Sequence, residues 1–368
     1  GSSVRAQVSG LLEYRDYLGG AFGNEFRGTM DAVVDWTLIP DRLKWGFADN
    51  LGLNPINLRQ PDTPDNLQQT NVFTTGPTLQ FRLGQATTGL AELRYTDSYA
   101  ENTDQFNSGR TSAAFRALRE LDSTRRLSGN LEVSDINYDN NSEQTDYKRY
   151  AGYAGYTQKL TQLDLDLALG YTSLDFTQGD NADGPLIRAK LAWRASPQST
   201  FGLGVYRDIS DVVSNLVADT SALIDGFGNI SVGGEAISPD VFKSDRVAAS
   251  YGFESTRISL TSAVSADKVR YVSDNATDSN RNEFGAELDL GYKLRPNLTL
   301  GILAGFVKRD YKTDGGDTRD TLFGAYLRHQ MSRHWGWRLD LNRNERNGNG
   351  DNPSYNENRA FARLIYSR

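Results

Sequence analysis

The sequence predicts an all-β fold: a transmembrane antiparallel up-and-down β-barrel of about 18 strands. The first observation behind this prediction is the stretch Leu163–Leu169, in which leucine occupies every second position, with Asp164, Asp166 and Ala168 between. A period of two gives a β-strand two different faces, whereas a helix would distribute the leucines around its circumference. The same alternation returns at 284–292 and 335–341. Strands with one apolar and one polar face are therefore the recurring unit of the chain.

The second observation concerns membrane-spanning helices. No uninterrupted run of apolar residues is longer than three, so the sequence predicts no helix that crosses a bilayer. The mean hydropathy of −0.56 is compatible with a transmembrane barrel, because a barrel needs apolar residues only at alternate positions. The chain contains 18 Tyr, 16 Phe and 5 Trp, which suit the aromatic girdles at the two membrane interfaces.

The third observation is the alternating length of the connections. Eight are tight turns, such as Pro40-Asp41 and Pro296-Asn297, and the others are longer and rich in Asp, Asn and Gly. Short turns at one end and long loops at the other are typical of bacterial outer-membrane barrels. An even number of strands then places both termini at the short-turn, periplasmic end. We expect one domain over residues 1–368, with the longest loops at 50–70 and 211–241.

The strands follow in chain order. The first predicted strands are 4–17 and 26–38, and a third runs through Leu43, Trp45 and Phe47 into the Pro-containing loop 50–70. The remaining predicted strands are 71–83, 88–99, 105–118, 126–138, 147–159, 163–176, 185–195, 199–210, 242–254, 257–271, 282–294, 298–312, 318–331, 335–345 and 356–367.

Two soluble architectures are the alternatives. The hairpin spacing is close to that of a β-propeller blade, but a blade packs four short strands where this chain fits two long ones. A soluble β-helix or sandwich would bury its apolar residues between layers and would not need aromatic bands at the strand ends. The observations favour the membrane barrel over both.

Composition excludes several functions. The net charge of −7 argues against nucleic acid as a partner, because phosphate binding needs a basic surface. Cysteine is absent, which removes disulfides, thiolate metal sites and cysteine nucleophiles, and suits a chain that crosses the oxidising periplasm. No signal peptide is visible, and Gly1-Ser2-Ser3 is consistent either with residues left by cloning or with a mature start after removal of a leader.

The sequence does not predict an enzyme. None of the common catalytic motifs is present, and the two histidines, His329 and His334, lie near one short turn, where interfacial roles suit them. Loop acids such as Asp314 and Asp317 are better explained as solvated residues than as a catalytic pair. We expect no cofactor and no metal site.

The polar face of the strands is the candidate functional surface. Taking the face opposite the apolar stripe yields a set of predicted pore-lining residues: Arg82, Glu92, Arg94, Arg116, Glu132, Arg188, Lys190, Arg194, Arg246, Glu254, Glu287, Asp289, Arg328, Arg338, Asp340, Arg359 and Arg363. Wide barrels hold water, so a polar lumen is expected on structural grounds alone, with charges paired across strands. The functional interpretation is a conduit for a hydrophilic solute, with arginine and lysine arrays favouring anionic cargo.

The loop at 211–241 has a second pattern. Val212, Val213, Leu216 and Val217 follow a helical spacing within otherwise polar sequence, and Leu223 and Ile224 continue it. This spacing predicts a short amphipathic helix. It either folds into the pore as a constriction or lid, or caps the barrel from outside.

The N-terminal quarter carries a family resemblance. The residues Asp41–Trp45, Asn50, Pro64, Asn66 and Thr70–Pro77, within roughly 10–95, resemble the outer-membrane β-barrel porin family associated with exopolysaccharide loci of the exosortase/PEP-CTERM type. The resemblance implies an integral outer-membrane protein that helps export a secreted polysaccharide. It transfers no individual functional residues to this sequence.

The combined expectation is a passive outer-membrane channel for polysaccharide export, with a polar lumen and a modest anion preference. One alternative is a general or oligosaccharide diffusion porin, and another is a structural barrel that sheathes or anchors a periplasmic partner. Expected partners are outer-membrane lipid, lipopolysaccharide, the polysaccharide or another hydrophilic solute, and a periplasmic export component.

Overall fold

The computed structural model describes the chain apart from residues 1–2, 19–21, 141–144, 217–237, 274–275, 277–278, 313–315, 350–351 and 368. The described residues form 18 β-strands, two short 3-10 helices, η1 (Pro64–Asn66) and η2 (Asp104–Phe106), and one α-helical turn at 212–216. None of the helices described is long and apolar enough to span a membrane.

The strands follow one another with few interruptions. They are β1 (Val4–Arg15), β2 (Glu25–Ile39), β3 (Leu43–Pro55), β4 (Leu67–Arg82), β5 (Thr87–Ala100), β6 (Ser108–Glu120), β7 (Arg125–Tyr138), β8 (Tyr147–Lys159), β9 (Leu163–Phe176), β10 (Ala182–Ser196), β11 (Ser199–Ser210), β12 (Phe242–Glu254), β13 (Ile258–Tyr271), β14 (Arg281–Arg295), β15 (Leu298–Tyr311), β16 (Asp317–Gln330), β17 (Trp335–Gly348) and β18 (Tyr355–Tyr366).

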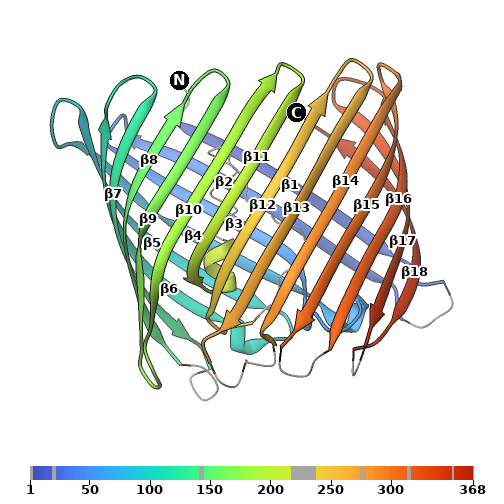
Figure 1. Ribbon diagram of the computed structural model, residues 1–368, viewed down its shortest axis with the longest axis horizontal. Helices are drawn as coiled ribbons and strands as arrows, with labels where there is room; N and C mark the ends of the chain where they lie inside the picture. The colour runs from blue at the N-terminus through green and yellow to red at the C-terminus, as the bar shows by residue number, and fades with distance from the viewer. Residues whose placement is uncertain are drawn as a thin grey trace.

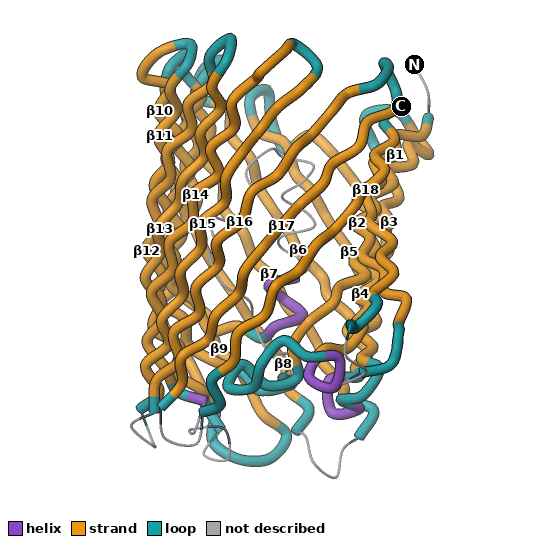
Figure 2. Tube along the Cα trace, turned by 90° about the vertical axis from the view of Figure 1, so that its right-hand side faces the viewer, coloured by secondary structure: helices purple, strands orange, loops and turns teal. Residues whose placement is uncertain are grey.

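The strands form one antiparallel sheet that curves into a barrel (Figures 1 and 2). Each pairs with its neighbours in the chain, from β1 with β2 to β17 with β18, so the predicted 18-stranded up-and-down architecture is confirmed. Within the described residues, no register pair joins β1 to β18. Figure 1 shows both termini at the end of the tight hairpins, opposite the longer loops. This is the arrangement that an even strand number predicts.

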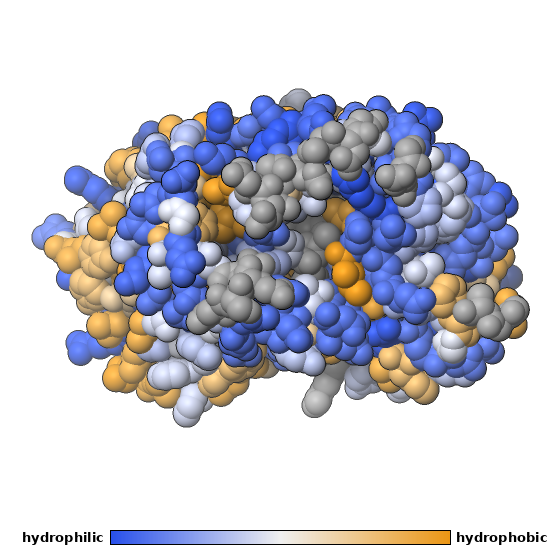
Figure 3. Space-filling model, turned by 90° about the horizontal axis from the view of Figure 1, so that it is seen from below, coloured by the Kyte–Doolittle hydropathy of each residue, from blue (hydrophilic) through white to orange (hydrophobic). Residues whose placement is uncertain are grey.

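The two faces of the wall differ as the alternation predicts. Leu12, Leu169 and Leu364 are 62–78% exposed on the outer face. Neighbouring residues in the same strands point inward, as with Ala168, which is 7% exposed and pairs with Arg188. Seen from the long-loop end, the rim is mainly hydrophilic and hydrophobic surface lies along the flanks (Figure 3). An exposed apolar outer surface is what lipid covers in a membrane barrel.

One predicted loop is too long. The segment 50–70 is not a continuous loop, because β3 extends to Pro55 and β4 begins at Leu67. Several of its polar residues belong to the strands and face the lumen, so they resemble loop residues in the sequence. Asn50 donates to Asp31 at 2.6 Å, and Asn54 donates to Thr70 at 2.7 Å. Only residues 56–66, hereafter the mouth loop, connect the two strands.

Candidate functional site

A short helical turn, residues 212–216 and hereafter the wedge, lies at the long-loop end of the barrel. The turn at 212–216 lies within the barrel outline near this end (Figure 2). Val212 and Val213 are 2% and 1% exposed and belong to a cluster that also contains Val72, Ala100, Phe106, Phe242 and Val269. These partners come from β4, β5 and η2 on one side, and from β12 and β13 on the other. The wedge therefore links walls that lie far apart around the sheet.

Asp211 fastens the wedge to the inner wall. Its carboxylate accepts hydrogen bonds from Arg110 at 2.7 Å, from Tyr147 at 2.8 Å, and from the backbone N–H and hydroxyl of Ser214 at 3.0 and 2.7 Å. The bonds from Ser214 cap the helical turn. Burial alone would raise the pKa of Asp211, but the Arg110 guanidinium and the Ser214 bonds outweigh it and hold the pKa below its ordinary value of 3.8.

The predicted helix in loop 211–241 is thus present at its start and folds inward. Residues 217–237, including Val217, Leu223 and Ile224, lie outside the described residues. For the part that the structure describes, the wedge occupies the mouth and does not cap the barrel from outside.

A connected series of charged side chains lines β5 to β11. Arg116 lies 3.7 Å from Glu92 and 3.5 Å from Glu132, which also accepts a hydrogen bond from Tyr153 at 2.7 Å. Arg149 joins this group to the next, 3.7 Å from Glu132. The predicted residues Glu92, Arg116 and Glu132 are therefore brought together by the register of neighbouring strands.

The series continues toward the wedge through Asp208. This carboxylate is 2% exposed and pairs with Arg188 at 2.7 Å and with Arg149 at 3.2 Å. Arg188 also lies 5.8 Å from the ring centroids of Tyr153 and Tyr206. Because Asp208 lies only three residues before the wedge anchor Asp211, the charged wall and the mouth form one connected site.

The opposite stretch, β14 to β18, carries an arginine row. Arg328, Arg338 and Arg363 are in direct cross-strand register. Like charges directly opposite each other are unfavourable in a sheet. Asp340 partly compensates them, 2.8 Å from Arg338 and 3.7 Å from Arg363. Arg338 stacks 3.8 Å above the ring centroid of Tyr326.

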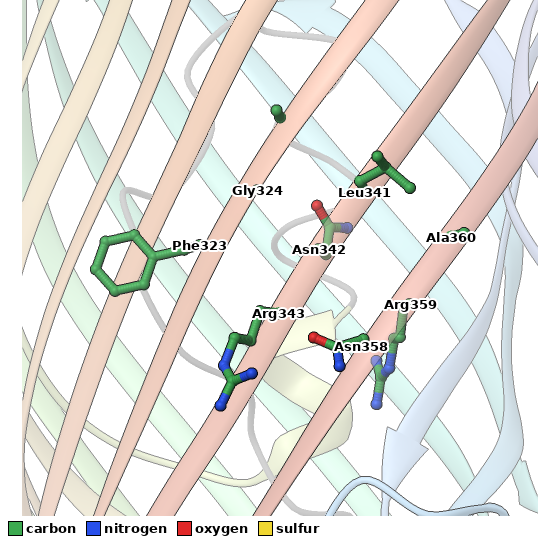
Figure 4. A pocket seen from close by; sticks show the side chains of 9 residues that line it. Phe323, Gly324, Leu341, Asn342, Arg343, Asn358, Arg359 and Ala360 are labelled. Atoms are coloured by element: carbon green, nitrogen blue, oxygen red, sulfur yellow. The ribbon is translucent and has the colours of Figure 1, made fainter.

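Two other predicted acids and one arginine lie near this row. Tyr326 donates to Asp289 at 2.9 Å, and Glu287 lies one inward position along β14, paired with Gly305. Figure 4 shows Arg359 on β18 next to Asn342 on β17, its register partner, in a hollow of the β16–β18 wall. The pore-lining role of all these residues stays a prediction.

The remaining predicted residues do not join a common site. Arg94 is the exception, because it lies 3.8 Å from Glu92 at the edge of the charged series, and it also donates to the Pro77 carbonyl and to Thr78. Arg194 pairs with Asp164 at 2.8 Å and Glu254 with Lys293 at 2.7 Å, both near short turns. The others are placed by their partners: Arg246 is 2.7 Å from Asp267, Lys190 is opposite Asp166, and Arg82 is opposite Thr88.

Several residues of the site are not among the predicted pore-lining residues. Arg110, Arg149 and Asp208 lie on the same inner face as the predicted set, so alternation was a sufficient signal to find them. Asp211 follows the end of β11, where no period applies. In the part of the chain that the structure describes, no group of three or more His, Cys, Asp or Glu residues is placed to hold a metal ion.

Comparisons with known proteins agree on the fold. No protein-family model matches the sequence, and no curated protein matches it. Among solved structures, the FrpB iron transporter from Neisseria meningitidis (F5-1 variant) is 9% identical, with 100% of this chain and 78% of that chain covered and a TM-score of 0.52. The copper transporter OprC is 11% identical, with coverages of 98% and 66% and a TM-score of 0.52.

These neighbours are transporters with outer-membrane β-barrels, and the likeness supports the same architecture here. The chain spans about two thirds of the copper transporter's length. The protein therefore has the fold of an 18-stranded outer-membrane β-barrel.

Proposed function

We propose that the protein is a passive channel that exports an anionic polysaccharide across the outer membrane. The observation that carries this proposal is the row Arg328, Arg338 and Arg363, three cations in register on the inner wall. A guanidinium can offer two parallel hydrogen bonds to a carboxylate, which suits a chain with acidic substituents. The acids among these cations keep the anion preference modest.

A polymer also needs several weak contacts instead of one tight site. On β10, Arg188, Lys190 and Arg194 occupy inward positions along one strand, about 7 Å apart for each two-residue step. Arg188 and Arg194 are already paired with acids. A carboxylate of the polymer would exchange with these acids, so no single cation would hold the polymer tightly. A periplasmic export component would deliver the polymer at the short-turn end.

Planar-bilayer recording tests the proposal. The wild-type channel should prefer anions modestly and be blocked by oligogalacturonate added from the short-turn side. An Arg328→Gln/Arg363→Gln variant should lose part of the preference and bind the blocker more weakly. Arg125→Gln, at an exposed short turn, is the matched control and should change neither.

Cells lacking the protein distinguish the alternatives. Loss of surface polysaccharide with unchanged uptake of small solutes supports export. Normal surface polysaccharide with slower nutrient entry would instead show a diffusion porin. Unchanged transport of both kinds, with a periplasmic protein released from the envelope, would show a structural barrel.

A further inference from the structure

A group of basic residues lies on the inner wall at the short-turn end of the barrel, the end at which Figure 1 shows both termini. Each lies within four residues of the end of its strand and occupies an inward position. They come from six of the seven strands β16–β18 and β1–β4 and are hereafter the cation arc: Arg328, Arg338, Arg363, Arg5, Lys44 and Arg82.

The cation arc carries an excess of positive charge. Four of its members are exposed, and among the described residues none of these four has an acidic side chain within ion-pair distance: Arg5, Lys44, Arg82 and Arg328. Two acids lie within the arc. Asp340 compensates Arg338 and Arg363, as described above, and Asp35 is opposite Arg5 in register. The remaining positive charges face the water of the lumen.

The opposite wall, β5 to β14, has a different charge pattern at the same end. Three ion pairs, 2.7–2.8 Å long, occupy inward positions there: Arg126–Glu120, Arg194–Asp164 and Lys293–Glu254. In these pairs each cation has a counter-charge beside it. The surplus positive charge of the inner rim is therefore concentrated on the side of the cation arc.

The long-loop end has the opposite charge. In the sequence, each of the nine connections at this end contains at least one Asp or Glu, and their only basic residues are Arg59 and Lys312. The whole chain has a net charge of −7, so the cation arc is a basic surface on an acidic protein. An anion that approaches the barrel is attracted to the short-turn end and repelled from the long-loop end.

We propose that the cation arc captures the exported polyanion at the periplasmic end, and that the acidic long-loop end disfavours its return. This step rests on the proposed function, since it takes the cargo to carry carboxylates. Each guanidinium of the arc can donate two parallel hydrogen bonds to a carboxylate. Because these side chains face the lumen, a polymer that threads the barrel passes them, whereas lipid headgroups lie outside the wall. The charge pattern acts on association rates and supplies no energy.

Block kinetics in planar bilayers test the capture. Oligogalacturonate is added to either chamber, and the rates at which block begins and ends are measured. In the wild type, block should begin faster from the short-turn side than from the long-loop side. Arg5→Gln/Lys44→Gln/Arg82→Gln removes half of the cation arc and keeps the row Arg328, Arg338 and Arg363.

The effect of this triple variant should depend on the side and on the salt concentration. In about 0.05 M salt, block from the short-turn side should begin about tenfold more slowly than in the wild type. The rate from the long-loop side and the rate at which block ends should stay unchanged, because the arginine row is intact. In 1 M salt, where the Debye length is about 3 Å, the two proteins should behave alike.

A matched control removes the same charge from the outer face. Arg119 is opposite the exposed Leu127, Arg125 lies at an exposed turn, and Arg257 donates to the hydroxyl of Tyr292 on the outer face. Arg119→Gln/Arg125→Gln/Arg257→Gln should change the rate at which block begins by less than about twofold, because salt screens charges outside the lumen. Heat-dependent migration on SDS gels verifies that each variant is folded.

Three outcomes overturn the inference, and they differ in what they mean for the channel. If oligogalacturonate blocks the wild type but the arc variant is blocked at the same rate, the arc does not capture the polymer, while the proposed anionic cargo stands. If the arc variant and the outer-face control slow block equally, the effect reflects total charge and not the arc. If oligogalacturonate blocks the wild type from neither side, both the capture and the anionic cargo are wrong.

Discussion

Asp211→Asn is expected to release the wedge from the wall while the barrel stays folded. Asp211 and Arg110 are 2% and 5% exposed, and their ion pair is 2.7 Å long. The substitution leaves the Arg110 charge buried without a counter-ion, and removing one partner of such a pair costs about 3–5 kcal/mol. The asparagine can keep the bonds to Tyr147 and Ser214, so we expect the lower end, about 3 kcal/mol. This corresponds to a shift of roughly a hundredfold toward the released wedge.

Thiol labelling measures this release directly, because the chain has no native cysteine. Val213 is 1% exposed, so a Val213→Cys variant should react slowly with a water-soluble maleimide. Adding Asp211→Asn should accelerate the reaction and raise the single-channel conductance.

Two comparisons make the test specific. The double change Arg110→Gln/Asp211→Asn removes the buried charge together with its partner, so it should label more slowly than Asp211→Asn alone. Asp122→Asn, which disrupts an exposed turn pair, should leave labelling and conductance unchanged. Equal labelling rates with and without Asp211→Asn would refute the idea that this carboxylate anchors the wedge.

Three further predictions concern the wall, the pH dependence and the barrel seam. Cysteines replacing Arg188 and Lys190 should react with a water-soluble reagent and one replacing Leu191 should not, since an arginine on the lipid face costs about 2–4 kcal/mol; reversed labelling would show a shifted register. Because the folded state lowers the pKa of Asp211, its carboxylate contributes stability that is present above the ordinary pKa of 3.8 and is lost as pH falls through the lower folded value. Labelling of the Val213→Cys variant should therefore stay slow at neutral pH and accelerate only below about pH 4. Acceleration near pH 6 would contradict this. Unpaired strand edges are costly in lipid, so the amides of β1 and β18 should exchange in proteoliposomes as slowly as those of β10; fast exchange confined to both edges would mean that the seam is open.

The sequence predicts the wall of this protein better than its mouth. Alternation places eighteen strands, and several have the predicted bounds, among them 147–159, 163–176 and 242–254. The period of two is strict because lipid and water impose opposite demands on neighbouring residues. At 50–70 the same physics misleads, because Asn50 and Asn54 are polar as lumen residues and not as loop residues.

The site depends on contacts that no local pattern encodes. Alternation identifies Arg116 and Glu132 as inward-facing, and antiparallel pairing of adjacent strands then brings them together. Arg110 and Asp211 are 101 residues apart, and Arg346 and Gln60 are 286 apart. Such pairs depend on how the loops fold back into the barrel, which the strand pattern leaves open. Assigning charged residues to the inner face by alternation identifies the candidate site residues but not their partners.

The position of the two loop insertions bears on how the channel works. Both lie at the long-loop end, and both are held to the inner wall by guanidinium groups: Arg110 holds the wedge, and Arg346 and Arg359 hold the mouth loop. Under the proposed function, a carboxylate-bearing polymer that moves along the arginines of the wall would reach the same kind of group at the exit. It would weaken the loop contacts by substituting for their acceptors, without a separate energy source. A neutral solute of the same width would have no such effect, so the proposal explains selectivity for acidic cargo and opening of the mouth by one interaction.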